Sequence, residues 1–342
     1  MESPQNIKKR LKSVNNINQI TKAMELVSAT KMRKSQQVAL DSRPYSFAAL
    51  ELLANVSVLE NLDKWKIPLF EVREKNPSTG LGLRVLFVLV ASDKGLAGAF
   101  NSSVFKKFET HIKEEREEWK KEEHLYLAIG QKAYDYLSKK FSPVVRTTGL
   151  SGKVLKKFVQ VGDYVTPEQV KPITDFIIDG YLGNPSTGSG QAKWDRVIVI
   201  STHFRSALKQ EPHVRRILPI DFDHVADTIK QIIPERGKFA DLIKEQNISF
   251  IPDKVKLKEY TIEPAPEKVL EKIAQHLFFM QMYHLILEAN ASEHSARRMA
   301  MKTASDNASD LGEKLNLQYN KSRQSKITTE IAEISAGAEA LN

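Results

Sequence analysis

Residues 84–90 read RVLFVLV, and every residue of this run after Arg84 is apolar. A short continuous apolar run predicts a strand that is buried on both faces, as the strands of a parallel sheet are. A loop with two glycines follows, ASDKGLAGAFN at Ala91–Asn101, and a helical pattern then extends from residue 102 to residue 121. A buried strand followed by a loop and a helix indicates an α/β domain.

The same alternation continues toward residue 220. The patterns predict strands or extended segments at 124–129, 144–148, 196–202 and 207–218, and helices at 131–140 and 167–181. Strands that alternate with helices imply a largely parallel sheet. We therefore predict a central Rossmann-like α/β domain over residues 84–220, with the flexible stretch GNPSTGSG at 183–190 as a surface loop.

The segment before this domain has the period of an amphipathic helix. Ser3 and Pro4 suit the N-cap and the first helical position. Pro44 is expected to kink the helix, but the apolar pattern resumes after it, so we predict an N-terminal helix over residues 1–60. Its apolar residues recur mostly at steps of three or four, at Ile7, Leu11, Val14, Ile17, Ile20, Met24, Val27 and Met32.

The segment after the domain predicts a second helix over residues 266–342, since no proline occurs after Pro266. At the rise of an α-helix this rod would be about 110 Å long and the first about 85 Å. Neither can bury an apolar stripe in a compact domain, so we expect the two to pair with each other. Small residues at 289–308 would allow close approach, and the spacing drifts from strict heptads. Residues 221–260 predict an insertion of mixed structure.

Composition and charge narrow the classes of function. The 342 residues include no cysteine, which excludes disulfides and cysteine-based metal sites. The absence of a long apolar run predicts no membrane span and no secretory signal. Residues 1–43 hold nine Lys and Arg against three acidic residues, a net charge of +6 within a total of +9. Such a segment favours an anionic partner: a nucleic acid, lipid headgroups or an acidic protein surface.

No motif in the sequence defines an active site. Gly95–Gly98, GLAG, lies between a strand and a helix where a phosphate could bind, but it matches no phosphate-binding pattern and favours a tight turn. His276, His284 and His294 have no further ligands at metal-binding spacing. We therefore expect no catalytic, cofactor-binding or metal residues. Two other classes stay open: a Rossmann-like nucleotide-binding enzyme with helical arms, and a nucleic-acid-binding coiled coil.

Three stretches near the two ends of the chain are informative: INQITKAMELVSATKMRKSQ at Ile17–Gln36, SEHSARRMAMKTASDNASDL at Ser292–Leu311, and LQYNKSRQSKITTEIAEISAGAEAL at Leu317–Leu341. Through these stretches, both ends of the chain resemble the gamma subunits of bacterial F-type ATP synthases. Within the central domain, ASDKGLAGAFN and the stretch HFRSALKQEP at His203–Pro212 are similar to loops of the same family. The likeness extends over nearly the whole chain.

The resemblance implies a fold and a set of partners. The terminal helices would form a long antiparallel coiled coil whose tip enters a ring of alternating alpha and beta subunits. The α/β domain would contact the epsilon subunit and the c-ring, at the cytoplasmic face of the bacterial cell membrane. Rotation driven by ion flux would change the nucleotide affinities of the beta subunits. The chain itself would be a non-catalytic rotor that binds no cofactor or nucleic acid and does not span the membrane.

The resemblance also implies which residues couple rotation to catalysis. Met24 matches a methionine near an acidic segment of beta, and Arg298 matches the arginine that faces this segment. Arg323, Gln324 and Thr328 match polar positions that meet a loop of beta near the tip.

The chain also departs from the family pattern. Ala97 stands where many relatives carry cysteine, and the regulatory dithiol loop of chloroplast relatives is missing. Three stretches are longer than usual, at 77–83, 183–193 and 234–258. These departures leave the contacts with epsilon and the c-ring open, and do not touch the terminal helices.

Overall fold

The computed structural model describes residues 3–41, 67–73, 83–115, 122–141, 153–162, 164–183, 192–220, 263 and 265–339. The predicted continuation of the first helix beyond residue 41, the extended segment at 144–148, the loop from residue 184 to residue 190 and the insertion at 221–260 lie outside these residues. The chain folds into two units. We call residues 31–296 the sheet unit, and residues 1–30 together with 297–342 the helix unit.

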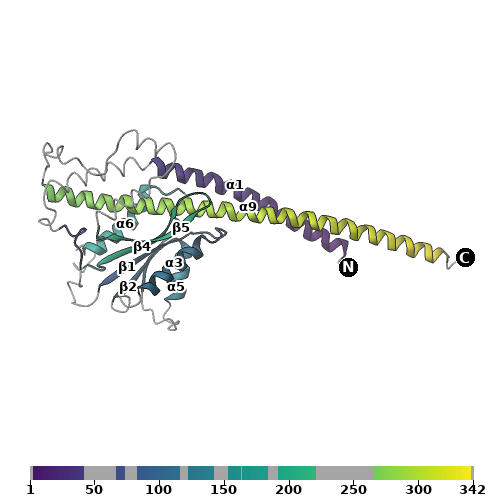
Figure 1. The fold of residues 1–342 in the computed structure, drawn as a ribbon, viewed down its shortest axis with the longest axis horizontal. Coiled ribbons are helices and arrows are strands. Elements are labelled where there is room, and N and C mark those ends of the chain that lie inside the picture. The colour runs from purple at the N-terminus through teal and green to yellow at the C-terminus, as the bar shows by residue number, and fades with distance from the viewer. Residues whose placement is uncertain are drawn as a thin grey trace. The chain divides into compact units, whose positions relative to one another are not determined.

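The sheet unit is built on five strands (Figure 1). They are β1 (Arg84–Val90), β2 (Glu123–Ile129), β3 (Lys153–Phe158), β4 (Arg196–Phe204) and β5 (Gln210–Leu218). The order in the sheet is β3-β2-β1-β4-β5; the first four are parallel, and β5 runs antiparallel to β4. The prediction of a largely parallel sheet is confirmed, and the order of the parallel strands is that of half a Rossmann fold.

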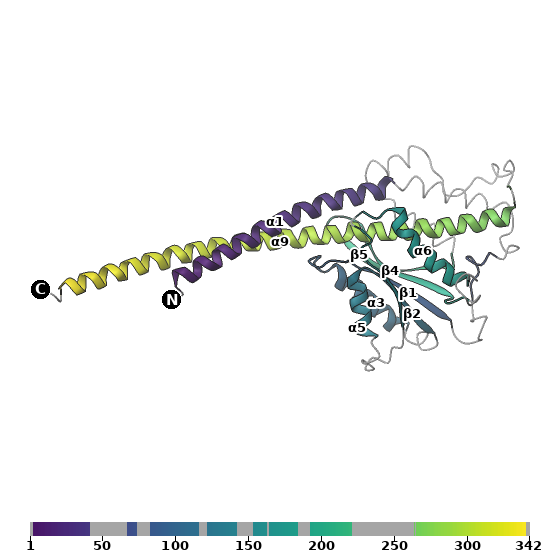
Figure 2. The ribbon, with the colours of Figure 1, turned by 180° about the vertical axis from the view of Figure 1, so that it is seen from behind.

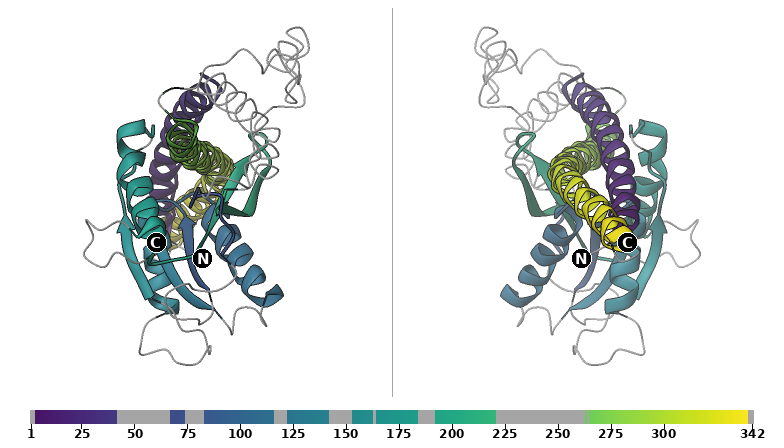
Figure 3. Two further views of the ribbon diagram at one scale, coloured as in Figure 1. Left: turned by 90° about the vertical axis from the view of Figure 1, so that its left-hand side faces the viewer. Right: turned by 90° about the vertical axis from the view of Figure 1, so that its right-hand side faces the viewer.

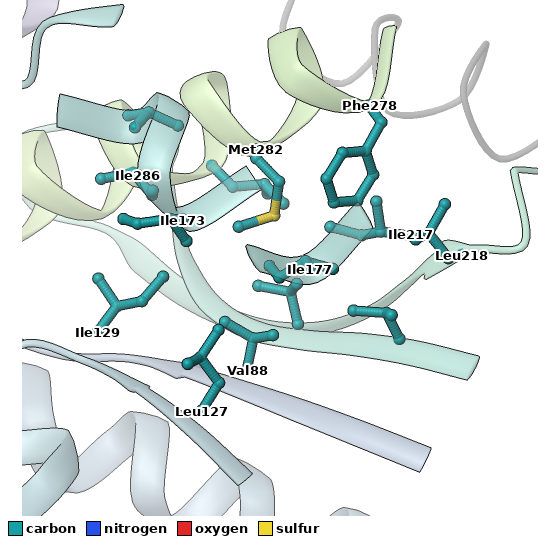
Figure 4. Packing of buried hydrophobic residues seen from close by; sticks show 14 of the residues in the cluster. Val88, Leu127, Ile129, Ile173, Ile177, Ile217, Leu218, Phe278, Met282 and Ile286 are labelled. Atoms are coloured by element: carbon teal, nitrogen blue, oxygen red, sulfur yellow. The ribbon is translucent and has the colours of Figure 1, made fainter. Parts of the chain in front are cut away.

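Helices cover both faces of this sheet. The described helices of the sheet unit are α3 (Phe100–Glu114), α5 (Gln131–Lys140), α6 (Pro167–Leu182), the part of α9 (Pro266–Glu339) up to residue 296, and the part of α1 (Pro4–Asp41) from residue 31. α3 and α5 pack through one hydrophobic cluster, and α6 and α9 pack through a second on the opposite face. In Figure 4, Met282 and Ile286 of α9 lie with Ile173 of α6 over Val88 and Leu127 of the strands.

α3 is shorter than its sequence pattern predicts. The pattern extends to residue 121, but the helix ends at Glu114 and Glu115 forms its C-cap. Ile112 is the last buried side chain of the helix, and residues 116–121 of the predicted range lie outside the described residues.

Sequence patterns do not predict strand β3. Its sequence is KVLKKF, and the three lysines obscure the strand signal. At the edge of the sheet the lysines cover aromatic rings: the Lys156 ammonium lies 4.7 Å from the ring centroid of Phe158, and that of Lys157 lies 4.3 Å from that of Tyr134. Charged side chains on an edge strand also discourage pairing with other chains.

The helix unit contains α1 (Pro4–Asp41) up to residue 30 and α9 from residue 297. The Ser305 hydroxyl donates a 2.6 Å hydrogen bond to the side-chain oxygen of Asn18, and Gly312 lies against Val14 and Asn15. Because residue numbers rise along α9 as they fall along α1, the two segments are antiparallel, as Figures 1 and 2 show. In the end-on views of Figure 3 they lie against each other.

The buried face of α1 differs from the predicted stripe. Ile17, Ile20 and Val27 are 52%, 59% and 53% exposed, whereas Thr21 and Ser28 are buried. Small polar side chains let the neighbouring backbone approach, and the larger aliphatic ones point outward. A series of buried and half-buried positions in this segment follows steps of four and three, at Ile7, Leu11, Val14, Asn18, Thr21, Glu25 and Ser28, and Met24 and Ala29 are half-buried as well.

Candidate functional site

The loop after β1 contains Gly95–Gly98, where the sequence analysis considered a phosphate-binding site. Its backbone enters the left-handed region at Leu96 (φ 63°) and Gly98 (φ 55°). The backbone N–H of Ser92 donates to the side-chain oxygen of Asn101 at 3.0 Å, and the Asn101 amide nitrogen donates to the Ser92 hydroxyl at 2.7 Å. The loop is therefore closed by its own side chains, as a tight turn requires.

Asp93 occupies the position near a helix N-terminus that an anion would take. One carboxylate oxygen accepts from the backbone N–H of Gln131, the first residue of α5, at 2.9 Å, and the other accepts from the N–H of Gln160 at 2.8 Å. A carboxylate here satisfies donors that a helix N-terminus offers to a phosphate, and its charge repels one. This geometry disfavours phosphate binding at the N-terminus of α5.

Two of the three histidines that the sequence analysis considered are buried, and His276 is half-buried. His284 and His294 on α9 are 3% and 2% exposed, so they belong to the packed core of the sheet unit. Within the described residues, no group of acidic and histidine side chains is arranged to hold a metal ion. The same residues include no helix that is both long enough and apolar enough to cross a bilayer.

Met24 and Arg298, two of the predicted coupling residues, lie at one level of the helix unit. Met24 is six residues past Asn18 on α1, and Arg298 is seven residues before Ser305 on α9. Measured from the Asn18–Ser305 hydrogen bond, these offsets are about 9 Å and about 10 Å in the same direction along the antiparallel pair. Both side chains are half-buried. The fold thus places two residues that are far apart in sequence at the same level along the helix pair.

Arg323, Gln324 and Thr328 lie beyond the reach of α1. Arg323 is eighteen residues past Ser305, whereas α1 begins fourteen residues before Asn18. At 1.5 Å per residue, Arg323 therefore lies about 6 Å beyond the first residue of α1 along the axis. All three side chains are exposed. The Thr328 hydroxyl donates to the backbone oxygen of Gln324 at 3.0 Å, which holds these two residues on one face. They form a polar patch on a helix segment that α1 does not cover.

Exposed aliphatic side chains accompany this patch. Ile327, Ile331 and Ile334 are 47%, 58% and 73% exposed, and every residue from 323 to 338 is exposed. Residues three and four apart share a helix face, so the three isoleucines form one apolar strip. A strip of this kind marks an interaction surface. The signal that could have revealed it is length, because α9 is 74 residues long and described α1 is 38.

The surface of α1 in the helix unit is basic. Its exposed cationic residues are Lys8, Lys9, Arg10, Lys12 and Lys22. Exposed like charges along one helix produce a field that attracts acidic partners and raises association rates. The two features of the helix unit, a basic helix and a bare apolar strip, both suit protein neighbours.

Comparison with known proteins agrees with these features. The family model described as ATP synthase matches residues 3–341. The ATP synthase gamma chain of Herpetosiphon aurantiacus is 34% identical over 342 residues, which cover 100% of both chains. Those of Roseiflexus sp. strain RS-1 and Bdellovibrio bacteriovorus are 33% and 32% identical, and each match covers 100% of this chain and 99% of the relative.

Solved structures support the fold. A chain in a cryo-EM structure of the Euglena gracilis mitochondrial ATP synthase, OSCP/F1/c-ring in rotational state 3, has a TM-score of 0.56 at 17% identity, with 99% of this chain and 94% of that chain covered. A chain in the rotor of the same synthase in rotational state 1 has a TM-score of 0.53 at 17% identity, with 95% and 98% covered. With the family match and the full-length relatives, these similarities establish that the chain belongs to the family of ATP synthase gamma chains.

Proposed function

We propose that this chain is the central-stalk rotor of an F-type ATP synthase, with its terminal helices as an antiparallel coiled coil that turns inside a ring of alternating alpha and beta subunits. The observation that carries this proposal is the exposed α9 segment from residue 323 to residue 338. Exposure of an apolar strip to water is unfavourable, and a surrounding ring of subunits would bury it.

The remaining partners follow from membership of the family. The sheet unit would contact the epsilon subunit and the c-ring of the membrane sector, and the chain would then lie at the cytoplasmic face of the bacterial cell membrane as a peripheral subunit. Ion flow through the c-ring would turn the rotor, and ATP would be made or hydrolysed at the alpha and beta sites. The chain would supply no catalytic group, cofactor or metal.

The five coupling residues fall into two groups in this proposal. Met24 and Arg298 would meet an acidic segment of beta at one level of the coiled coil. Arg323, Gln324 and Thr328 would meet a loop of beta nearer the tip. An asymmetric shaft that contacts each beta subunit differently would bias each toward a different nucleotide affinity, and such differential contact is all that coupling requires.

Co-expression with the alpha and beta subunits of the same organism tests the proposal. We expect a complex with one copy of this chain to elute as a single species on size exclusion and to hydrolyse ATP only when all three subunits are present. A matched variant that ends after Ser322 should lose most of this association. If the chain does not associate with alpha and beta, and the isolated chain binds nucleotide or DNA, the proposal is wrong.

A further inference from the structure

Helix α9 crosses the sheet unit with polar anchors on both sides of its apolar stripe. The stripe includes Met282 and Ile286, which pack into the core of the sheet unit (Figure 4). Apolar contacts of this kind oppose a large rotation of the helix, which would expose the stripe, but they are non-directional and set its exact orientation less sharply than polar contacts do. Hydrogen bonds and ion pairs fix a direction, and α9 makes them with both flanks.

Glu288 provides the anchor on the side of β4 and β5. One of its carboxylate oxygens lies 2.9 Å from Nδ1 of His203, at the end of β4, and 4.0 Å from Nη1 of Arg215 on β5. The carboxylate is 7% exposed. About two turns further on, the Ser295 hydroxyl donates a 2.7 Å hydrogen bond to the backbone oxygen of Ala207, in the turn between the same two strands.

The charge of Glu288 is preserved in this interior. Burial by itself raises the pKa of the carboxyl group, but the hydrogen bond with His203 and the charges of His203, Arg215 and His284 outweigh it and lower the pKa below its usual value. The group is therefore a carboxylate near neutral pH. Since a carboxylate only accepts hydrogen bonds, Nδ1 of His203 is the donor.

The opposite flank of α9 is anchored to the segment between β3 and α6. The Tyr283 hydroxyl donates to the backbone oxygen of Val165 at 3.3 Å, and the Asn290 amide donates to that of Gly162 at 3.0 Å. At 100° per residue, Tyr283 points about 140° and Asn290 about 160° away from Glu288 around the helix, with the apolar stripe between Glu288 and these two residues. A turn of α9 about its axis would pull at least one flank off its anchor.

We propose that Glu288 is a positioning residue that locks α9 against rotation about its own axis, so that torque passes between the sheet unit and the long helix. The inference rests on the rotor function proposed above. A rotor must transmit torque from the part that meets the membrane ring to the part that meets the catalytic subunits. α9 continues without interruption from Pro266 to Glu339, so a lock on its first part acts on the whole helix.

Stability alone does not account for this arrangement. Buried ion pairs give little net stability, and an apolar replacement of similar volume is often neutral or stabilising. What such a pair provides is one defined geometry. A chain that needed only adhesion between α9 and the sheet could have continued the apolar stripe through residue 288.

Variants of Glu288 in the whole synthase, assembled in sealed membrane vesicles, test the proposal. Glu288→Gln keeps the size of the side chain and removes its charge, and Glu288→Leu removes both polar contacts. The matched control is Glu109→Gln, which breaks a carboxylate contact with Lys140 between α3 and α5, away from α9. The readouts are ATP hydrolysis, ATP-driven ion pumping and the melting temperature of the chain.

We expect both Glu288 variants to hydrolyse ATP and to lose ion pumping per ATP, the leucine variant more than the glutamine variant, while the control keeps the wild-type ratio. An unchanged ratio in the Glu288 variants overturns the proposal. The proposal is also overturned if Glu109→Gln loses as much ion pumping per ATP as the Glu288 variants at an equal fall in melting temperature, since general destabilisation then explains both losses. A wild-type complex that hydrolyses ATP without pumping would instead defeat the rotor function.

A disulfide supplies the rescue. The chain has no cysteine, so Ala207→Cys and Ser295→Cys, introduced where these residues touch, create the only possible intrachain bridge. In a Glu288→Gln background, oxidation should restore the pumping ratio and reduction should abolish it again, with Glu288→Gln alone insensitive to both. If all free thiols are lost, so that the disulfide has formed, and pumping does not recover, then Glu288→Gln does not act by releasing α9 and the proposal is wrong.

Discussion

The hydroxyl of Ser305 donates a 2.6 Å hydrogen bond to the side-chain oxygen of Asn18, which lies 287 positions earlier in the chain. Two helices from opposite ends of the sequence thus meet through small polar side chains. Leucine at this position would add volume where the helices already touch, and overpacking of this kind costs about 1–3 kcal/mol. Ser305→Leu should therefore lower the free energy of unfolding by about that amount, measured by urea denaturation followed by circular dichroism.

Ser309→Leu is the control for this experiment. Ser309 lies one turn further along the same helix and is exposed, so leucine there changes helix composition equally without entering the contact. We expect a change within about 0.5 kcal/mol for this variant. Equal effects of the two substitutions would mean that Ser305 does not lie at a tight contact.

Gly180 on α6 should tolerate no side chain. A Cβ atom there would lie 2.0 Å from Cζ2 of Trp194, whose ring is fully buried and whose indole N–H donates to the backbone oxygen of Ile177 at 3.0 Å. Gly180→Ala must displace this ring, so we expect a loss of about 2 kcal/mol or more. A shift of the tryptophan fluorescence should accompany it.

Gly337→Ala makes the matched comparison. Gly337 is also helical, but nothing lies within 4 Å of a Cβ placed on it. Alanine favours an exposed helix by about 1 kcal/mol over glycine, so the variant should be neutral or stabilising. If Gly180→Ala were equally neutral, the close packing of α6 against Trp194 would be refuted.

Sequence patterns identify most of the elements of the sheet unit. The apolar runs of β1 and β4 and the periodic pattern of α6 give their types and nearly their bounds, because burial on both faces or on one helix face leaves a strong signal. The sequence pattern does not predict β3, because an edge strand with three lysines lacks such a signal. The order of the strands also needs the structure, since it depends on contacts that no local pattern encodes.

The candidate site divides in the same way. The family motif supplies Met24, Arg298 and the three polar residues near the tip, and their role as coupling contacts stays a prediction. Periodicity alone misjudges the surface, because Ile17 and Ile331 continue an apolar pattern and yet are exposed. A stripe found in a sequence does not reveal whether its partner belongs to the same chain.

Glu109 should make the fold sensitive to acid. Hydrogen bonds from Lys140 and Tyr136, at 2.5 and 2.7 Å, lower the pKa of its carboxyl group below 4.5. A group with a lowered folded pKa contributes stability that is complete above its unfolded pKa and is lost as the pH falls through the folded value. The melting temperature of wild type should therefore fall from neutral pH toward about pH 3 more steeply than that of Glu109→Gln. Parallel curves for the two proteins would exclude this contribution.

Arg298 and Gln324 should affect coupling without affecting folding. Arg298 is half-buried and Gln324 is exposed, and neither belongs to a hydrophobic core cluster. Arg298→Ala and Gln324→Ala should each lower the rate of ATP synthesis in membrane vesicles and leave the melting temperature of the isolated chain within a few degrees of wild type, as surface substitutions do. The exposed neighbour Gln318 provides a control, Gln318→Ala, on the same helix. Wild-type synthesis in both variants would count against the assignment of these contacts.

Ile331 tests the surface on which the proposed function depends. Its side chain is 58% exposed, between Ile327 and Ile334 on one helix face. Aspartate at this position places a charge in solvent in the isolated chain, so the melting temperature should not change by more than a surface substitution allows. Inside a ring of subunits the same charge would lie in an apolar contact, where burial of an unpaired carboxylate costs several kcal/mol.

We therefore expect Ile331→Asp to weaken assembly with alpha and beta at least tenfold, measured by titration of the ring with labelled chain. Glu330→Gln, at the exposed neighbouring position, should assemble normally. If Ile331→Asp assembled as well as wild type, the bare strip of α9 would face water in the complex too, and its role as the covered end of the rotor would have to be given up.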